Sequence, residues 1–241
     1  MNESDLKIEA ARLGVFLNPS RLAAFKAYTE MILAWSSRMN LTAVKAPEQI
    51  VTKHYADSLS LLPLIDEHAK TLIDVGTGAG FPGLPLAIAA PHIQFFLIDS
   101  LNKRVNFVRE VVKQLNLKNV SCEHARAQEA APRLDCFENF DAATARAVAS
   151  MTEISKCCLP FVSPGGFFYA MKGPSALKEI AEAEATIESL GGKLKSVETV
   201  NLKGSFEGGD ITHAIYAVEK IRSVPYKRKQ KCKPPSKAKA P

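Results

Sequence analysis

Residues 72–83 read LIDVGTGAGFPG, and they give the strongest indication of the fold. The apolar run Leu72–Val75 is typical of a short buried strand. Glycines at 76, 78 and 80 then let the backbone turn sharply and approach a ligand, because glycine has no Cβ. Pro82 and Gly83 suit the start of a helix. A strand, a glycine loop and a helix in this order indicate an open α/β sheet with a ligand site at the carboxyl ends of its strands.

The segments that follow alternate between strands and helices. We expect strands at residues 72–75, 95–98, 120–122, 142–145 and 167–171, and helices at 84–90, 103–115, 151–161 and 176–190, with a brief helical turn near 127–131. This alternation predicts right-handed crossovers and a mainly parallel sheet with helices on both faces. The last two strands, Leu194–Val200 and Ala214–Glu219, have no helix between them and predict a hairpin-like pair at one edge of the sheet.

Residues 1–65 show helical periodicity and no strand pattern. Apolar residues recur at threes and fours through the second predicted helix, and Pro47 suits the start of a third. The aromatic residues Phe25, Tyr28 and Trp35 are expected in the helix-packing core. We therefore predict an N-terminal helical extension over residues 1–65, an α/β core over 66–220 and a tail over 221–241.

The positive charge of the chain lies at its C-terminal end. The chain has 31 Lys and Arg against 25 Asp and Glu, a net charge of +6. Residues 222–241 hold eight basic residues and no acidic ones, so residues 1–221 hold 23 basic and 25 acidic residues, a net charge of −2. This distribution predicts either an electrostatic arm for a polyanion or a solvated end that aids solubility.

Composition excludes several classes of protein. With 46% hydrophobic and 23% charged residues, the chain is not mainly disordered, collagenous or a disulfide scaffold. The five cysteines lack CxxC spacing and the five histidines are scattered, so we predict reduced thiols, a cytoplasmic location and no metal site. The acidic start and the lack of a long apolar run predict neither a signal peptide nor a membrane span.

An aspartate at the end of the second predicted strand narrows the class of ligand. Asp99 follows the run Phe95–Ile98 and is expected beside the glycine loop, where its carboxylate would accept the two hydroxyls of a ribose. The two features together indicate a cofactor that carries a nucleoside. A dinucleotide site has the pattern GxGxxG, but Phe81 stands at the position of the third glycine, which favours a ligand without a pyrophosphate.

The GxGxG loop, with a carboxylate after the second strand, resembles the class I (Rossmann-like) S-adenosylmethionine-dependent methyltransferases. Further motifs make the resemblance more specific. They are NLTA at 40–43, HYADSL at 54–59, the extended loop at 74–86, LIDS at 97–100 with KR at 103–104, RAQE at 126–129, RA at 146–147, and PGG at 164–166 through KG at 172–173. In this order they resemble the RsmG/GidB family (glucose-inhibited division protein B), over about residues 38–220.

The resemblance implies a reaction, a cofactor and a partner. Members of this family methylate N7 of a guanine in 16S ribosomal RNA with S-adenosylmethionine, and we expect the substrate in the 30S subunit or a precursor. We expect no metal, no membrane and no obligate protein partner. The implied cofactor site comprises Gly76, Gly78, Gly80, Phe81, Asp99, Ala127, Gln128 and Arg146. Relatives usually have Glu where Gln128 stands, but Gln also forms a hydrogen bond with an amino group.

Methyl transfer to guanine N7 needs orientation more than acid–base chemistry, because N7 already presents an unprotonated lone pair. We therefore expect cationic donors that position the RNA or the base, and no general base. The resemblance places such arginines at Arg126 and Arg146, although each position also suits an ordinary surface arginine. His54 and Asp57 are three residues apart on one predicted helix face, where they either frame the cofactor site or form a helix-packing pair.

Two positions depart from the family pattern. Many relatives have a basic residue where this chain has Phe167, and another where it has Thr212-His213. Three other functions stay open on the sequence. They are a Rossmann oxidoreductase, a non-catalytic RNA-binding assembly factor, and an S-adenosylmethionine-dependent methyltransferase of a small molecule.

Overall fold

The computed structural model of the chain describes residues 3–36, 41, 47–133, 136–146, 149–173, 176–202 and 210–225. Within these residues, seven strands form one sheet in the order β3-β2-β1-β4-β5-β7-β6. The strands are β1 (Thr71–Val75), β2 (Gln94–Asp99), β3 (Val120–His124), β4 (Phe140–Arg146), β5 (Val162–Lys172), β6 (Gly192–Leu202) and β7 (Ile211–Lys220). The first five are mutually parallel, and β7 runs antiparallel to both of its neighbours. The predicted sheet, closed at one edge by its last two strands, is confirmed.

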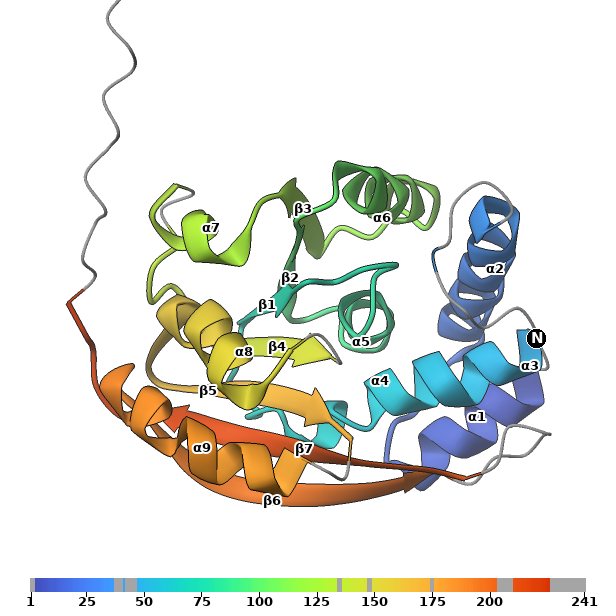
Figure 1. Cartoon of the computed structure of the whole chain (residues 1–241). Helices are drawn as coiled ribbons and strands as arrows, with labels where there is room; N and C mark the ends of the chain where they lie inside the picture. Colours follow the sequence, from blue (N-terminus) through green and yellow to red (C-terminus); the bar gives the residue numbers. More distant parts are fainter. Residues whose placement is uncertain are drawn as a thin grey trace, which may run out of the picture.

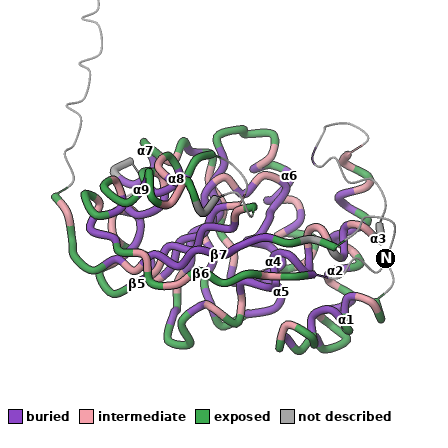
Figure 2. Tube along the Cα trace, turned by 60° about the horizontal axis from the view of Figure 1, so that its bottom comes forward, coloured by how far each residue is buried: buried purple, intermediate pink, exposed green. Residues whose placement is uncertain are grey.

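Helices cover both faces of the sheet (Figure 1). One face carries α1 (Glu3–Arg12), α2 (Pro19–Ser36), α5 (Gly83–Ala89) and α6 (Asn102–Gln114), and the other carries α7 (Ala127–Arg133), α8 (Met151–Cys158) and α9 (Ala176–Ser189). Successive strand residues point to opposite faces, so Leu72 belongs to the first hydrophobic core and Ile73 to the second. The central strands are consequently buried along most of their length, as Figure 2 shows.

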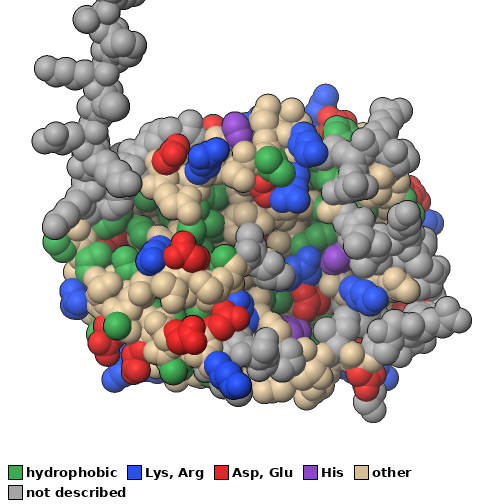
Figure 3. Space-filling model, in the orientation of Figure 1, with side chains coloured by type: hydrophobic (Ala, Val, Ile, Leu, Met, Phe, Trp, Pro, Cys, Tyr) green, Lys and Arg blue, Asp and Glu red, His purple; other side chains and the backbone are tan. Residues whose placement is uncertain are grey.

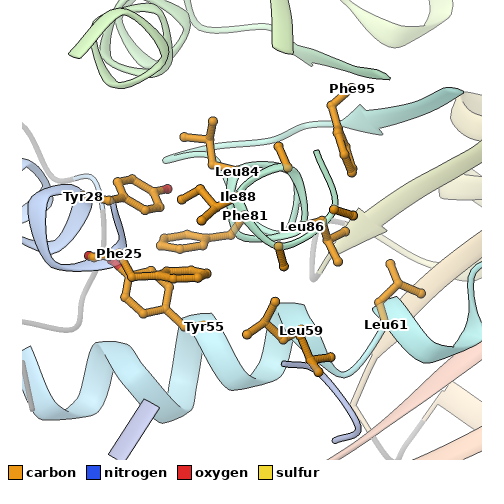
Figure 4. Packing of buried hydrophobic residues seen from close by; sticks show 14 of the residues in the cluster. Phe25, Tyr28, Tyr55, Leu59, Leu61, Phe81, Leu84, Leu86, Ile88 and Phe95 are labelled. Carbon is orange, nitrogen blue, oxygen red and sulfur yellow. Dashed lines mark hydrogen bonds between the residues drawn. The ribbon is translucent and has the colours of Figure 1, made fainter. Parts of the chain in front are cut away.

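The N-terminal helices share the core that lies beneath the glycine loop. Phe25 and Tyr28 of α2 are fully buried, as predicted. Figure 4 shows Phe81, just before α5, lying between Tyr28 and Tyr55. The ring centroid of Phe81 is 5.7 Å from that of Tyr28 and 6.1 Å from that of Tyr55. The N-terminal extension therefore packs directly against the segment that begins α5.

The third predicted helix is interrupted. It begins at Pro47 as predicted, but it consists of α3 (Pro47–Ile50), the π-helical turn η1 (Val51–Ala56), the short α4 (Asp57–Leu59) and the 3₁₀ turn η2 (Leu62–Leu64). A similar 3₁₀ turn, η3 (Leu159–Phe161), follows α8. π-helical turns are rare and recur at functional sites, so the residues of η1 are candidates for a functional role.

The end of β7 is fastened to the body of the protein by a buried ion pair. Lys220 is fully buried, with Nζ 3.0 Å from Oε1 of Glu138. Glu138 also accepts hydrogen bonds from the Ser223 hydroxyl and the Val224 amide. Residues 221–225 thus lie against the body, whereas residues 226–241 of the predicted tail lie outside the described residues. Across the described part of the chain, no helix is long and apolar enough to span a bilayer.

Candidate active site

The glycine loop joins β1 to α5. Gly76, Gly78 and Gly80 adopt φ values of 77°, 61° and 101°. A Cβ at Gly78 would meet only the Gly76 carbonyl oxygen, at 4.0 Å, whereas a Cβ at Gly80 would lie 2.7 Å from the Tyr28 hydroxyl and closer still to Leu84. Glycine is therefore favoured at 78 by backbone conformation alone, and at 80 by close packing against α2 and α5 as well.

Asp74, at the end of β1, ties the two ends of the loop together. Its Oδ2 accepts hydrogen bonds from the Thr77 hydroxyl at 2.6 Å and from the Gly83 amide at 2.9 Å. Burial raises the pKa of Asp74 to about 6, and these two hydrogen bonds limit the rise. The carboxyl is 1% exposed, so it shapes the loop from within the core.

Asp99 lies where the sequence predicts it, at the end of β2 beside the loop. Its Oδ2 accepts a hydrogen bond from the Gly78 amide at 2.9 Å, and its Oδ1 accepts one from the Leu101 amide at 2.8 Å. Nη1 of Arg104 is 3.6 Å from Oδ2. These contacts hold the carboxylate in one orientation, and each oxygen retains a lone pair for a further donor.

A cavity of about 480 Å³ opens at the carboxyl ends of β1, β2 and β4. Its walls are mainly apolar and come from the strand ends and from α7 and α8, including Val75, Ile98, Ala125, Ala145, Ile154 and Cys158. Five predicted site residues line it: Gly76, Asp99, Arg126, Ala127 and Gln128. The other four, Gly78, Gly80, Phe81 and Arg146, are not among its lining residues.

The residues after β3 form the side of the cavity nearest to α8. Arg126 is exposed, and Ala127 is half-buried. The Gln128 side-chain amide donates a hydrogen bond to Sγ of Cys157 in α8, at 3.3 Å.

Arg146, at the end of β4, lies in a mostly buried network. Its Nη1 donates hydrogen bonds to Oδ2 of Asp57 at 2.7 Å and to the Lys53 carbonyl at 3.4 Å, and its Nη2 lies 3.2 Å from Nδ1 of His54. The Arg146 side chain is 16% exposed. His54 and Asp57, which the sequence only suggested as a pair, are thus joined through this guanidinium, and neither lines the cavity.

Phe81 connects this network to the glycine loop. The His54 ring stacks on the Phe81 ring with centroids 4.4 Å apart and planes 21° from parallel. The Arg146 guanidinium carbon lies 4.9 Å from the centroid of the same ring. A cation over an aromatic face is attracted to it. Phe81 therefore contacts the arginine network in this structure, although the sequence placed it at the cofactor.

His213 completes the network, and the sequence analysis missed it. Its Nδ1 lies 3.0 Å from Oδ1 of Asp57, and its Nε2 lies 3.4 Å from the Ser60 hydroxyl. Burial would by itself raise the pKa of Asp57, but the His213 ring and the Arg146 guanidinium outweigh burial and hold that pKa below its usual value. The signal that could have found His213 is its place at the start of an antiparallel strand, since such a strand begins where its parallel neighbours end.

One further basic residue forms an ion pair away from the cavity, and parts of two predicted motifs lie outside the described residues. Lys172, at the end of β5, forms an ion pair with Glu179 of α9, with Nζ 2.7 Å from Oε2. Most of the predicted NLTA motif at 40–43, and residues 147–148 after Arg146, lie outside the described residues. Among the residues that are described, no cluster of His, Cys, Asp and Glu could hold a metal ion.

Solved structures of a methyltransferase and of a polyamine synthase share this architecture. A SAM dependent methyltransferase from Aquifex aeolicus superimposes with a TM-score of 0.51 at 20% identity, over 74% of this chain and 96% of that chain. A branched-chain polyamine synthase mutein from Thermus thermophilus gives a TM-score of 0.55 at 14% identity, over 83% of this chain and 65% of that chain. At such identities the similarity shows the fold alone.

Sequence comparisons show the family. The family model described as rRNA small subunit methyltransferase G (GidB) matches residues 21–206. A protein of Clostridium perfringens (strain 13 / Type A) named "Ribosomal RNA small subunit methyltransferase G" is 44% identical over 214 residues, 88% of each chain. A protein of the same name from Acetivibrio thermocellus is 41% identical over 243 residues, 98% of each chain. The predicted resemblance is confirmed, and the chain belongs to the rRNA small subunit methyltransferase G (GidB) family.

Proposed function

We propose that the protein transfers the methyl group of S-adenosylmethionine to N7 of a guanine in 16S ribosomal RNA. The observation that carries the proposal is the placement of the Asp99 carboxylate and of Gly76, the first glycine of the loop, on one apolar cavity in a chain of this family. We further propose that the substrate is the 30S subunit or a precursor. We also propose that the reaction takes place in the cytoplasm.

The cavity fits an adenosine-containing cofactor. Its volume of about 480 Å³ lies within the range of small-ligand sites, and such sites combine apolar walls with a few placed polar groups. Asp99 would accept hydrogen bonds from the two ribose hydroxyls, and Ile98, Ala127 and Ile154 would pack on the adenine. When bound, S-adenosylmethionine supplies a methyl group on a positively charged sulfur. The carboxylate is already held by the Gly78 and Leu101 amides, so it needs little reorganisation to bind.

The residues around the site support a reaction without a general base. Guanine N7 exposes an unprotonated lone pair, so the protein has to orient the base and the methyl group in line. His54 is poorly suited to take a proton, because burial and the nearby Arg146 guanidinium lower its pKa to about 4. Its Nδ1 faces Nη2 of Arg146, which only donates, so the ring proton lies on Nε2.

Arg126 and Arg146 are the proposed substrate-positioning residues. Arg126 is exposed at the rim of the cavity, where a guanidinium can reach an RNA phosphate or the guanine O6. Arg146 lies within hydrogen-bond distance of Asp57 and His54, and these contacts fix the orientation of its guanidinium group. The target base has to be accessible or extruded from its stack to reach the cavity.

The test supplies radiolabelled S-adenosylmethionine to the purified protein with unmodified 30S subunits, naked 16S rRNA, or no RNA. We expect label at a guanine N7 in the RNA and none in the protein-only control. Label at another atom or base would contradict the substrate. Binding to RNA without binding of S-adenosylhomocysteine would instead identify a non-catalytic assembly factor.

Asp99→Ala tests the cofactor site directly. We expect affinity for S-adenosylhomocysteine, measured by equilibrium dialysis, to fall at least tenfold, because the ribose hydroxyls lose a charged acceptor worth about 1.5–3 kcal/mol. Glu198→Ala is the matched control, since Glu198 is an exposed carboxylate on β6 and does not line the cavity. Equal affinities for Asp99→Ala and the wild type would exclude this carboxylate from the site.

A further inference from the structure

The reversed direction of β7 brings a residue to the site that the parallel strands do not supply. Arg146 pairs with Met171 in β5, and Lys172, the next residue of β5, pairs with Ala214 of β7. His213 directly precedes Ala214. The end of β4 and the start of β7 therefore flank the same end of β5, with Arg146 on one side and His213 on the other.

One carboxylate bridges these two side chains. Oδ2 of Asp57 accepts a hydrogen bond from Nη1 of Arg146 at 2.7 Å, and Oδ1 lies 3.0 Å from Nδ1 of His213. The side chains of Asp57 and His213 are only 12% and 8% exposed. Water therefore has little access to replace either partner. Oδ2 accepts the guanidinium hydrogen bond, whereas the contact of Oδ1 with His213 is a close approach of two polar atoms that are not aligned as a hydrogen bond.

The donor and acceptor roles in this bridge follow from the groups themselves. A guanidinium only donates and an ionised carboxylate only accepts, so Nδ1 of His213 carries a proton where it faces Asp57. With the guanidinium bonded to Oδ2 and the imidazole 3.0 Å from Oδ1, the carboxylate is held from both sides, and so is the guanidinium that binds it. Without His213, Oδ1 would lose a partner in a buried place, and rotation of the carboxylate would move Arg146 with it.

We propose that His213 is a positioning residue of the active site, which acts through Asp57 to aim Arg146 at the substrate. This inference rests on the proposed function, in which Arg146 contacts the RNA or the target base. It assigns a role to the Thr212-His213 position, where the sequence showed only a departure from the family pattern. His213 and Asp57 do not line the cavity, so the inference predicts an effect on methyl transfer and not on cofactor binding.

The test compares His213→Leu with His213→Asn, which have nearly the same shape. The asparagine amide replaces the Nδ1 proton donor, and leucine does not. With unmodified 30S subunits, we expect His213→Leu to lower kcat by about tenfold to a hundredfold, as expected when a reacting group is misplaced by about 1 Å. We expect His213→Asn to stay within about threefold of the wild type, and the affinity of both variants for S-adenosylhomocysteine to stay within about twofold. These limits are our expectations for a positioning role.

A double-mutant cycle tests the route through Asp57. In an Asp57→Asn background, His213→Leu should cause little further loss of kcat, because both changes break the same bridge. If His213→Leu does not bind S-adenosylhomocysteine and has lost its fold, the comparison of His213→Asn with His213→Gln replaces it, since the glutamine amide lies one bond farther out. Additive losses in the cycle would contradict the proposed route.

A measurement without RNA separates this inference from the proposed function. The Nε–Hε nuclear magnetic resonance signal of Arg146 should shift in His213→Leu and stay near its wild-type position in His213→Asn. If the wild type does not methylate 16S rRNA, the proposed function fails, and this signal still tests the positioning of Arg146. An unmoved signal, a wild-type kcat in His213→Leu, or equal losses in the leucine and asparagine variants would overturn the inference.

Discussion

His54 lies between a guanidinium and an aromatic ring, and this position controls how it titrates. Nη2 of Arg146 is 3.2 Å from Nδ1 of His54, and the Phe81 ring stacks on the imidazole. Burial, reinforced by the Arg146 charge, lowers the pKa of His54 from 6.5 to about 4. In the folded protein His54 is therefore neutral at pH 5 and above, whereas the unfolded chain takes up a proton near pH 6.5.

This difference predicts a loss of stability in mild acid. As the pH falls from 6.5 towards 4, the unfolded state binds a proton that the folded state does not, so unfolding becomes more favourable. Between pH 7.5 and pH 4.5 we expect the wild type to lose about 2–3 kcal/mol of unfolding free energy relative to His54→Gln, which does not titrate. Urea unfolding of both proteins at both pH values measures this loss of unfolding free energy. The raised pKa of Asp74 acts in the opposite direction, but it is common to both proteins and cancels. A pH-independent difference between the two proteins would rule out a neutral, buried His54.

At the scale of elements, α2 supports the glycine loop from the side opposite the cavity walls of α7 and α8. The Tyr28 hydroxyl donates a hydrogen bond to the Ala79 carbonyl within the loop. Tyr28 is fully buried, and it leaves no room for a side chain at Gly80. Figure 4 shows the Tyr28 ring beside Phe81, to which it is tilted by 35°. The N-terminal helices are therefore part of what holds the loop in this conformation.

Tyr28→Phe removes this hydrogen bond and little else. We expect a loss of about 1 kcal/mol in unfolding free energy, because the Ala79 carbonyl is left without its tyrosine partner. We also expect a threefold to tenfold weaker affinity for S-adenosylhomocysteine by equilibrium dialysis, the equivalent of about 0.5–1.5 kcal/mol. Tyr169→Phe is the matched control, since Tyr169 lies in β5 and does not line the cavity. Equal affinities in the two variants would show that α2 does not support cofactor binding.

At the scale of the whole molecule, the basic tail and the folded body differ in charge. Residues 1–221 carry a net charge of −2, and in the view of Figure 3 the described Lys and Arg side chains are interspersed with Asp and Glu. Because β7 is antiparallel to β5, its last residues lie where the parallel strands begin. The cavity lies at the other end of these strands, where they finish. Residues 221–225 are attached at the end where the parallel strands begin, through Glu138 and Gly191.

The attachment indicates where a truncation should begin. Deletion of residues 226–241 removes seven basic residues and spares the contacts of Arg222, Ser223 and Val224. If the tail binds phosphates, log K for 16S rRNA should fall less steeply with log salt concentration, by about 0.7 for each lost contact with single-stranded RNA. A full-length chain with those seven residues changed to Gln controls for length. Identical salt slopes in all three proteins would leave the tail as a solvated end.

Much of this fold and half of the site follow from local sequence. Apolar residues that recur at short intervals predict the order of strands and helices, because each element is indicated by residues close together in the sequence. The glycine loop and Asp99 are also local, because each marks the end of a strand and parallel strands end at one edge. For that reason Gly76 and Asp99 were predicted from local sequence, whereas Arg126, Ala127 and Gln128 were implied by the family resemblance; all five line the cavity.

The remaining contacts of the site depend on how distant segments pack. Asp57 is 89 residues from Arg146 and 156 from His213, and no periodicity relates their positions. Their meeting depends on the π-helical turn η1, on the end of β4, and on an antiparallel β7 inserted between β5 and β6. Register and side-chain ion pairs are set by the packing of the whole sheet, which is why the sequence predicted five residues that line the cavity but not the network that holds Arg146.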